Sequence, residues 1–394
     1  MPHKIPSRWA AIGVFLFSST LNYLDRQMLP AVAPTLREEF HLSMEDYGWV
    51  LSVFSVVYAV AAPAVGLFLD RVGLNRGISS AVGVWSLATI WTGLSGGLGG
   101  LLASRGLLGL AQSAGVPGFG KASSVYLPSR ERALGTAFSQ VGISIGSIAA
   151  PLIAAWATSH YGWRAAFLVA GALGFLWIPL WLLTARRVPK LPAAEAGASM
   201  RIGEVLRSRQ YWALLAATCL AMTVYSLWTN WVTVFLVRDW HMSMADANRQ
   251  LAWIPPLVAT IGVLLGGAAS LRLARAGLPV HQARMRACLM GGVALLITAL
   301  VPHMPSAALA TWAIAFSYLA STFFNVNLYA MPLDIFGPDR AAFAVASLTM
   351  AYGLMQTFVS PLIGRVIDVH GFSPVCLAIA PLPLAAVMVM RWAR

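Results

Sequence analysis

The chain has 394 residues and a formal net charge of +13; 58% of its residues are hydrophobic and only 10% are charged. Soluble domains carry roughly 25% charged residues, so the composition excludes an ordinary water-soluble protein and indicates an outer surface that meets lipid. The positive charge alone would fit a nucleic-acid-binding protein, but the placement of the basic residues excludes that class, as shown below.

Apolar stretches long enough to cross a membrane follow one another along the chain. A bilayer core of about 30 Å requires about 20 mostly apolar residues in a helix. Twelve such stretches are predicted, at 9–32, 46–69, 77–96, 99–125, 133–158, 163–184, 211–237, 248–271, 283–302, 306–333, 342–367 and 373–391. The first is too long for a signal-peptide core and lacks a clear cleavage site, so we expect an uncleaved span. The predicted fold class is an all-α membrane protein with 12 transmembrane helices.

One polar, basic segment with two prolines interrupts this series near the middle of the chain, at 185–209. We therefore expect an N-terminal six-helix bundle at 1–184, a cytoplasmic linker at 185–209 and a C-terminal six-helix bundle at 210–394. The other connections are short turns and leave no room for a soluble catalytic domain. The seven histidines all fall in predicted tails or loops, and the three cysteines lack a CxxC pair or metal-ligand spacing. The sequence thus predicts no enzyme, no metal site and no cofactor.

The basic residues predict the orientation of the chain. With the N-terminus inside, the predicted outer side holds only Arg37, Arg164, Arg238 and Arg249, whereas the inner loops and tails hold most of the other arginines and lysines. This positive-inside bias predicts an inner-membrane protein with both termini in the cytoplasm. The positive charge is a signal of topology, and no nucleic-acid partner is expected.

The two halves of the sequence are related. Pro151-Leu152-Ile153 follows a basic loop and is matched by Pro361-Leu362-Ile363, roughly half a chain later. Parallel six-helix repeats, with a substrate site between them near the midplane, are typical of the major facilitator type of transporter. The repeat therefore indicates two six-helix bundles of that type.

The loop between the second and third predicted spans resembles the signature of the major facilitator superfamily. The matching residues are Gly66, Asp70, Arg71, Gly73 and Arg76. The glycines would allow close approach of helices, and the resemblance implies that the charged residues latch the two halves in an outward-open state. A basic loop that only fixes topology is the alternative. In the second half Leu271 stands where related proteins often carry the aspartate, so a second latch is expected to be weak or absent.

Ionisable groups deep in a membrane are costly and are therefore candidates for function. Asp25 and Arg26 lie deep in the first predicted span, and Arg105 lies at similar depth in the fourth. Lys121 is nearer the inner end of the fourth span and can extend to water. A buried ion pair of Asp25 with Arg105 that only holds two helices together is the structural alternative.

Three segments resemble the anion:cation symporter family, which includes sialin and bacterial hexuronate and galactonate transporters. They read NYLDR at 22–26, RGLLGLAQSAGVP at 105–117 and YLPSRERA at 126–133. The resemblance implies that Tyr23, Arg26 and Tyr58 contact an organic anion, and that Asp25 is a protonation site paired with Arg105. Guanidinium suits this role because it binds carboxylates in a bidentate way and keeps its charge.

Two departures from the family bear on the substrate. Gln112 stands where the family usually has a glutamate, so Asp25 is the only carboxylate left deep in the predicted cavity, and we expect one proton to move with one monoanion. Leu354 stands where the family has an asparagine, which weakens the assignment to a sugar acid and leaves a smaller or more apolar carboxylate equally open. Gln112 is a candidate substrate contact, with plain packing as the alternative.

The C-terminal half offers weaker candidates. Polar or amphipathic side chains in otherwise apolar spans are predicted to line the cavity; they are Tyr225, Asn230, Asn325, Tyr329 and Gln356. Packing between helices is the competing interpretation for each of them. The resulting functional hypothesis is a monomeric secondary transporter that moves a small organic anion, a carboxylate, together with a proton by alternating access. A proton-independent organic-anion exchanger or uniporter is the alternative.

Overall fold

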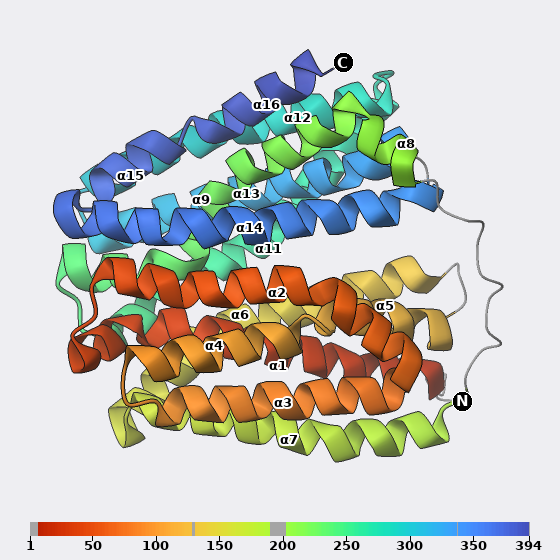
Figure 1. Cartoon of the computed structure of the whole chain (residues 1–394). Helices are drawn as coiled ribbons and strands as arrows, with labels where there is room; N and C mark the ends of the chain where they lie inside the picture. The colour runs from red at the N-terminus through yellow and green to blue at the C-terminus, as the bar shows by residue number, and fades with distance from the viewer. Residues whose placement is uncertain (1–6, 128–130, 190–201, 337, 394) are drawn as a thin grey trace, which may run out of the picture. The chain divides into compact units, whose positions relative to one another are not determined.

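The computed structural model describes residues 7–127, 131–189, 202–336 and 338–393, and all regular structure in these ranges is helical (Figure 1). By internal contacts the chain divides into two compact units. The first comprises Met1–Leu42, Trp49–Glu195 and Met244–Arg249, and the second comprises Ser43–Gly48, Ala196–Ser243 and Gln250–Arg394. The predicted bundles at 1–184 and 210–394 remain a prediction about how the chain is organised into domains.

Seven helices make up most of the first unit. They are α1 (Ser7–Phe40), α2 (Met44–Val72), α3 (Leu74–Leu94), α4 (Leu98–Gln112), α5 (Gly115–Tyr126), α6 (Arg132–Tyr161) and α7 (Trp163–Arg187). The predicted single span at 99–125 is divided between α4 and α5. Pro117 explains the break, because its ring collides with the carbonyl four residues earlier and its nitrogen donates no hydrogen bond.

The short helix α8 (Ile202–Arg207) belongs to the second unit and lies inside the segment predicted as a linker; residues 190–201 of that segment lie outside the described residues. The helices that follow are α9 (Arg209–Trp240), α10 (Met244–Asp246), η2 (Ala247–Ala252), α11 (Ile254–Arg275), α12 (Val280–Ala294), η3 (Leu295–His303), α13 (Ala307–Phe336), α14 (Pro338–His370), α15 (Phe372–Ile379) and α16 (Leu382–Trp392). Of these, α10 and the start of η2 belong to the first unit.

Nine helical stretches in the described part of the chain are long and apolar enough to span a membrane. They are Leu74–Leu94, Val141–Tyr161, Trp163–Arg187, Arg209–Trp240, Met244–Arg275, Val280–His303, Ala307–Phe336, Phe343–His370 and Phe372–Trp392. Membrane crossing by α1, by α2 and by α4 with α5 remains a prediction. At 34 residues, α1 is about 50 Å long, which exceeds the thickness of the hydrocarbon core.

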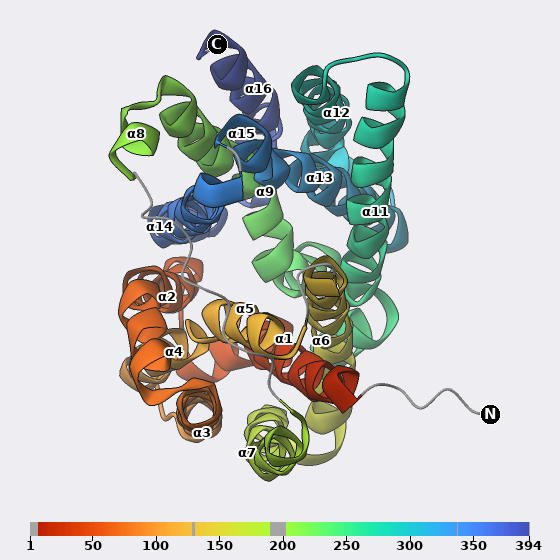
Figure 2. The ribbon, with the colours of Figure 1, turned by 90° about the vertical axis from the view of Figure 1, so that its right-hand side faces the viewer.

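Glycines on α6 allow it to pack directly on the backbone of α1, and Figure 2 shows the two helices in contact nearly end-on. A methyl group at Gly146 would meet the Thr20 carbonyl oxygen and would lie 2.9 Å from the Leu24 nitrogen. One added at Gly142 would lie 2.7 Å from the Leu16 carbonyl oxygen. This pair of small residues, four positions apart, is the arrangement that brings membrane helices into backbone contact.

Replacing Gly146 by alanine is expected to lower the thermal stability of the protein. The obstructing atoms belong to the α1 backbone, so the helices must separate, at a cost of about 1–3 kcal/mol. The melting temperature of the detergent-purified variant measures the effect. Gly13→Ala is the matched control, because a methyl group there would meet no atom within 4 Å. Equal melting temperatures for the two variants would contradict the close-packing interpretation.

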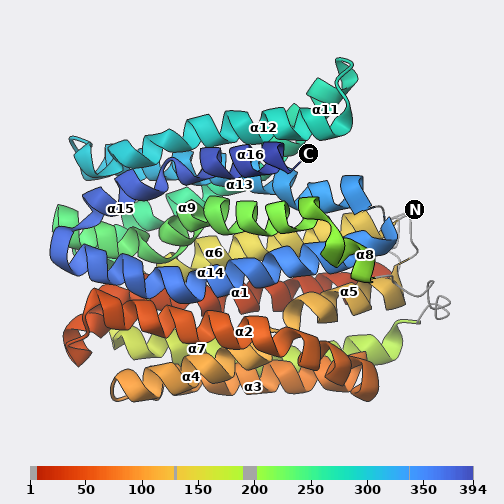
Figure 3. The ribbon, with the colours of Figure 1, turned by 45° about the horizontal axis from the view of Figure 1, so that its top comes forward.

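In the second unit α11 packs on α13 in the same manner. A methyl group at Gly266 would lie 2.5 Å from the Phe323 carbonyl oxygen. The Asn327 amide donates a hydrogen bond to the Gly266 carbonyl at 3.0 Å, and the Thr322 hydroxyl donates to the Ala259 carbonyl at 2.7 Å. Polar side chains thus stabilise this helix contact from within, as expected where water is excluded. Around it, α9, α12, α13 and α16 run side by side (Figure 3).

An ionic contact joins the end of α1 to the start of α7, beyond the predicted first span. The Trp163 indole nitrogen donates to Glu39 at 2.6 Å, and Arg164 forms an ion pair with the same carboxylate at 2.7 Å. Chiefly through the Trp163 hydrogen bond, these contacts lower the pKa of Glu39. Because folding lowers this pKa, the stabilisation is present at neutral pH and is lost as the pH falls through the folded-state pKa.

Glu39→Gln is therefore expected to lower the melting temperature at pH 7, and the difference from the wild type is expected to vanish in acid. Since the site is partly exposed, we expect a shift of only ~1–2 °C. Melting curves from pH 7 down to about pH 3.5, below the ordinary glutamate range, measure the effect. Glu38→Gln, at an exposed neighbouring position, is the control. A difference that stays constant with pH would rule out the Glu39 charge as its source.

Candidate functional site

A cavity of about 170 Å³ lies within the first unit, among α1, α2, α3, α4, α5 and α6. Four of the predicted substrate residues line it together: Tyr23, Arg26, Tyr58 and Gln112. Their positions are far apart in the sequence, so the fold gathers onto one wall residues that were selected by charge, by polarity and by resemblance. This cavity is the candidate functional site.

Aromatic rings surround the guanidinium group of Arg26. Its central carbon lies 4.8 Å from the Tyr23 ring centroid, 4.8 Å from that of Phe54 and 5.0 Å from that of Tyr58. Cation–π contacts of this kind stabilise a cation that has been removed from water, by ~2 kcal/mol where desolvation is complete. The rings hold a permanent positive charge at the cavity wall, where an anion can approach it.

Asp25 and Arg105 do not line the cavity and are buried, each only 1% exposed. The polar side chains that act on the Asp25 carboxylate are Thr89 and Arg105. Neither carboxylate oxygen of Asp25 has a hydrogen-bond partner among the described residues, and its pairing with Arg105 remains a prediction. The Arg105 guanidinium carbon lies 4.8 Å from the Phe54 ring centroid, which places Phe54 between the two arginines as a shared contact.

Gln112 is fully buried and joins α4 to α1. Its side-chain nitrogen donates to the Asn22 carbonyl oxygen at 3.1 Å. A glutamate at this position could donate the same hydrogen bond only in its protonated form, because an ionised carboxylate has no donor. The amide therefore provides permanently an interaction that a carboxylic acid would provide only in one protonation state.

The superfamily-like loop begins where α2 ends. Gly73 adopts a φ of +87°, which favours glycine, and its backbone nitrogen donates to the Leu69 carbonyl at 3.1 Å. Lys121 of α5 donates to the same carbonyl at 2.8 Å, so the lysine that was expected to reach water stabilises the helix terminus. The sequence argument assigned the glycines to close helix packing. A methyl group at Gly66 would meet no atom within 4 Å. Among the described residues, Gly66 therefore does not lie in close contact with another helix.

The structure describes only some of the charged side chains of this loop. Arg71 and Arg76 are exposed at the end of α2 and the start of α3. Asp70 is a residue of α2, but its side chain lies outside the described residues. The role of Gly66, Asp70, Arg71, Gly73 and Arg76 as a conformational latch therefore stays a prediction.

In the second unit, the Tyr225 ring packs edge-on against Tyr318 and Tyr352, with centroids 5.2 and 6.0 Å away. The Tyr318 hydroxyl shares a hydrogen bond of 2.8 Å with Thr229. Asn230 donates to the Ser226 carbonyl of its own helix at 2.9 Å. These contacts agree with both a cavity lining and ordinary helix packing.

Asn325, Tyr329 and Gln356 also lie in the second unit. The Asn325 amide reaches the Ser321 hydroxyl at 3.4 Å, and its side-chain oxygen is buried without a hydrogen-bond partner among the described residues. Tyr329 packs against the apolar core formed with α9, α12 and α16, while Gln356 is buried on α14. No further observation assigns a ligand to these three residues, so their role remains a prediction.

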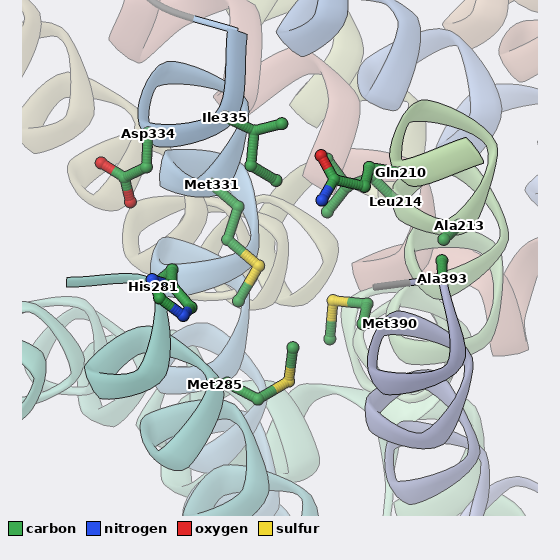
Figure 4. Close-up of a pocket in the computed structure, with 10 residues that line it drawn as sticks. All are labelled: Gln210, Ala213, Leu214, His281, Met285, Met331, Asp334, Ile335, Met390 and Ala393. Atoms are coloured by element: carbon green, nitrogen blue, oxygen red, sulfur yellow. The ribbon is translucent and has the colours of Figure 1, made fainter. Parts of the chain in front are cut away.

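A second cavity, of about 310 Å³ and so larger than the first, lies in the second unit between α9, α12, α13 and α16 (Figure 4). Three methionine side chains, Met285, Met331 and Met390, enter it, and His281 and Asp334 stand at its edge. Asp334 forms an ion pair with Arg284. None of the predicted substrate residues lines this cavity, so its size does not make it the candidate site.

Comparison with known families decides the class of the protein. The family model of the Major Facilitator Superfamily matches residues 15–360, which covers the candidate cavity and most of both units. The chain belongs to the major facilitator superfamily. It is therefore a multi-pass membrane transporter rather than an enzyme, and the superfamily predicted from the sequence is confirmed.

Two relatives of this facilitator are named for sugar acids. The hexuronate transporter of Escherichia coli (strain K12) is 28% identical over 97% of this chain and 93% of its own length. The galacturonate transporter of Dickeya chrysanthemi is 32% identical over 66% of this chain and 80% of its own length. Among solved structures, a bacterial homolog of the human lysosomal transporter Spinster superposes with a TM-score of 0.76 at 21% identity, over 99% of this chain and 96% of that one, which supports the fold.

The cavity of this facilitator contains residues that the sequence argument missed. The lining also includes the neutral polar side chains of Ser18, Ser19, Asn22 and Ser139 and the aromatic Trp85, alongside Gly115, Val116, Phe119 and Ile143. Serine and asparagine are common in transmembrane helices as packing residues, so nothing distinguished these from the others. For Asn22 and Ser19 a signal existed in their spacing from Arg26, four and seven residues along one helix, which places all three on one face.

Proposed function

We propose that this facilitator moves an organic carboxylate across the membrane in symport with one proton. The observation that carries the proposal is Arg26, a guanidinium held by three aromatic rings on the wall of a cavity. A planar cation fixed in this way binds a carboxylate through two parallel hydrogen bonds. The hexuronate and galacturonate relatives, whose names denote carboxylic acids, support the same class of substrate.

Proton coupling in this proposal depends on Asp25. It is buried, lies beside Arg105 and Thr89, and is adjacent in sequence to the proposed substrate-binding arginine. Neutralising a buried carboxylate by protonation removes a charge that is costly at membrane depth, so binding and release of the proton can follow the alternation of access. Because Gln112 cannot ionise, Asp25 is the one carboxylate to which we assign the proton, and one proton would accompany one monoanion in an electroneutral cycle.

The remaining site assignments form part of the same proposal. Residues of the second unit would complete the substrate site: Tyr225, Asn230, Asn325, Tyr329 and Gln356. The charged loop after α2 would stabilise one conformational state, both termini would be cytoplasmic, and a monomer would be the working unit.

Uptake into proteoliposomes tests the proposal. The full-length protein would be reconstituted, an inward acid gradient imposed, and acids of several classes supplied: hexuronates, hexonates, short-chain monocarboxylates, dicarboxylates and aromatic acids. We expect uptake of one class above its equilibrium distribution, with matching alkalinisation outside reported by a pH-sensitive dye. Exchange of internal for external acid without any response to the gradient would instead establish a proton-independent exchanger, and gradient-insensitive net uptake would establish a uniporter.

A further inference from the structure

We propose that Asn22, together with the Ser19–Ser139 pair, recognises hydroxyl groups of the substrate and so selects hydroxylated carboxylates over apolar ones. The inference rests on the proposed function, because it assumes that Arg26 binds the carboxylate of the same molecule. No relative or motif assigns a role in binding to these three residues.

The first observation is a complementary pair of unused hydrogen-bonding groups at the cavity. Asn22 is 7% exposed and its side-chain nitrogen has no acceptor among the described residues. Gln112 is fully buried, and although its nitrogen is bonded to α1, its side-chain oxygen has no donor in the described part of the chain. A hydroxyl group is both donor and acceptor, so it can satisfy one group of each kind.

Leaving such groups unpaired in a buried site is costly, because they lose their bonds to water and gain none in return. Both side chains line the cavity, and the terminal torsion of asparagine is broad, so a rotation of Asn22 can direct its amide toward a bound molecule. The amide of Gln112 is already held in place by its bond to α1. An apolar ligand at this position would keep both groups unpaired, which disfavours it relative to a hydroxylated one.

A second polar position lies farther along the same wall. The hydroxyls of Ser19 on α1 and Ser139 on α6 share a hydrogen bond of 3.2 Å, and both residues line the cavity. Each hydroxyl keeps capacity for a further bond, since it has one donor and two acceptor sites.

The spacing of these positions defines the shape of the ligand. Asn22 is four residues from Arg26, about one helical turn, and Ser19 is seven residues away, about 10 Å along the axis. A molecule that uses all three positions carries its carboxylate at one end and hydroxyl groups both in the middle and toward the other end. This pattern describes a polyhydroxy acid and excludes a short or purely apolar carboxylate, the choice that Leu354 left open.

Equilibrium binding to the detergent-purified full-length protein tests the inference. D-Gluconate and hexanoate share a six-carbon monocarboxylate chain and differ in their hydroxyl groups; D-galactonate and D-galacturonate extend the hydroxylated set. We expect at least one hydroxylated acid to bind about tenfold more tightly than hexanoate, a difference of ~1.4 kcal/mol. Asn22→Leu should weaken that acid by about tenfold and leave hexanoate unchanged, and Ser19→Ala combined with Ser139→Ala should do the same, both from the loss of a hydrogen bond.

The possible outcomes distinguish a failure of hydroxyl recognition from a failure of carboxylate binding. If hexanoate binds to the wild type as tightly as every hydroxylated acid, or if Asn22→Leu weakens both kinds of acid equally, hydroxyl recognition is overturned while carboxylate binding stands. If no acid binds, the proposed function itself is overturned, and this inference with it. Arg26→Ala provides the reference for complete loss, since it should abolish binding of both kinds of acid.

Discussion

Asp25→Asn is expected to abolish acid-driven accumulation of substrate, reducing it to the level of protein-free liposomes. The substitution keeps the size of the side chain and removes only its ability to carry and release a proton. Asp25 is buried beside Arg105, and Gln112 is permanently neutral, so among the described residues the cavity lining offers no carboxylate to take over. Exchange of labelled for unlabelled substrate, which needs no net proton movement, should persist in the variant and should lose its dependence on pH.

The measurement pairs these two assays on the same proteoliposomes, with the melting temperature recorded for each variant. Asp334→Asn is the matched control, because Asp334 is paired with Arg284 in the second unit and lines a different cavity. If Asp25 and Arg105 only hold helices together, Asp25→Asn will lower stability and will reduce both assays in parallel. Accumulation that remains fully driven by acid in Asp25→Asn would refute proton coupling through this residue.

Arg26→Lys is expected to weaken substrate binding by roughly ten- to a hundredfold, even though the positive charge is preserved. A lysine ammonium cannot form two parallel hydrogen bonds to a carboxylate, and it lacks the flat surface that packs against Tyr23, Phe54 and Tyr58. A charge-assisted hydrogen bond contributes about 1.5–3 kcal/mol, and a factor of ten in affinity corresponds to ~1.4 kcal/mol. Arg26→Ala should remove measurable binding.

Titration calorimetry and the substrate dependence of uptake both report this change. Arg164→Lys is a matched control, because Arg164 also contacts aromatic rings, of Phe40 and Trp163, but lies at the start of α7 and outside the cavity. We expect that control to keep the wild-type KM. An unchanged KM in Arg26→Lys would show that Arg26 does not contact the substrate, whatever its role in folding.

Some of the candidate site could be read from the sequence because charge stands out in an apolar helix. Asp25, Arg26 and Arg105 interrupt long hydrophobic runs, so their burial could be inferred before any contact was known. Tyr58 required the family resemblance, since a tyrosine in an apolar span has many possible roles. The structure places Tyr58 beside Arg26 and introduces Phe54, an ordinary apolar residue whose contact with both arginines no pattern could reveal.

Other features depended on tertiary contacts and escaped prediction. The division of one predicted span into α4 and α5 follows from Pro117, whose effect is visible in the sequence but was outweighed by the continuous apolar character of 99–125. Ser19 and Ser139 are separated by most of the first unit, and their pairing depends on the packing of α6 against α1. Close helix packing was expected at Gly66, where no described atom lies within 4 Å of an added methyl group; it is found instead at Gly142 and Gly146, for which no packing role was predicted.

The two faces of α1 have different tolerance for change, and this has consequences for how the range of substrates can diversify. One face presents the backbone near Leu16, Thr20 and Leu24 to the glycines of α6, where even a methyl group cannot be added. Side chains at 18 and 22 instead line a cavity. Ser19 also lines it, but its Cβ lies 3.2 Å from a methyl group added at Gly142, so it borders the α6 contact as well. Laboratory evolution aimed at new acids should therefore vary positions 18 and 22 first and leave Gly142 and Gly146 untouched. A helix built in this way allows a transporter to bind a new substrate while its packing against the neighbouring helix stays the same.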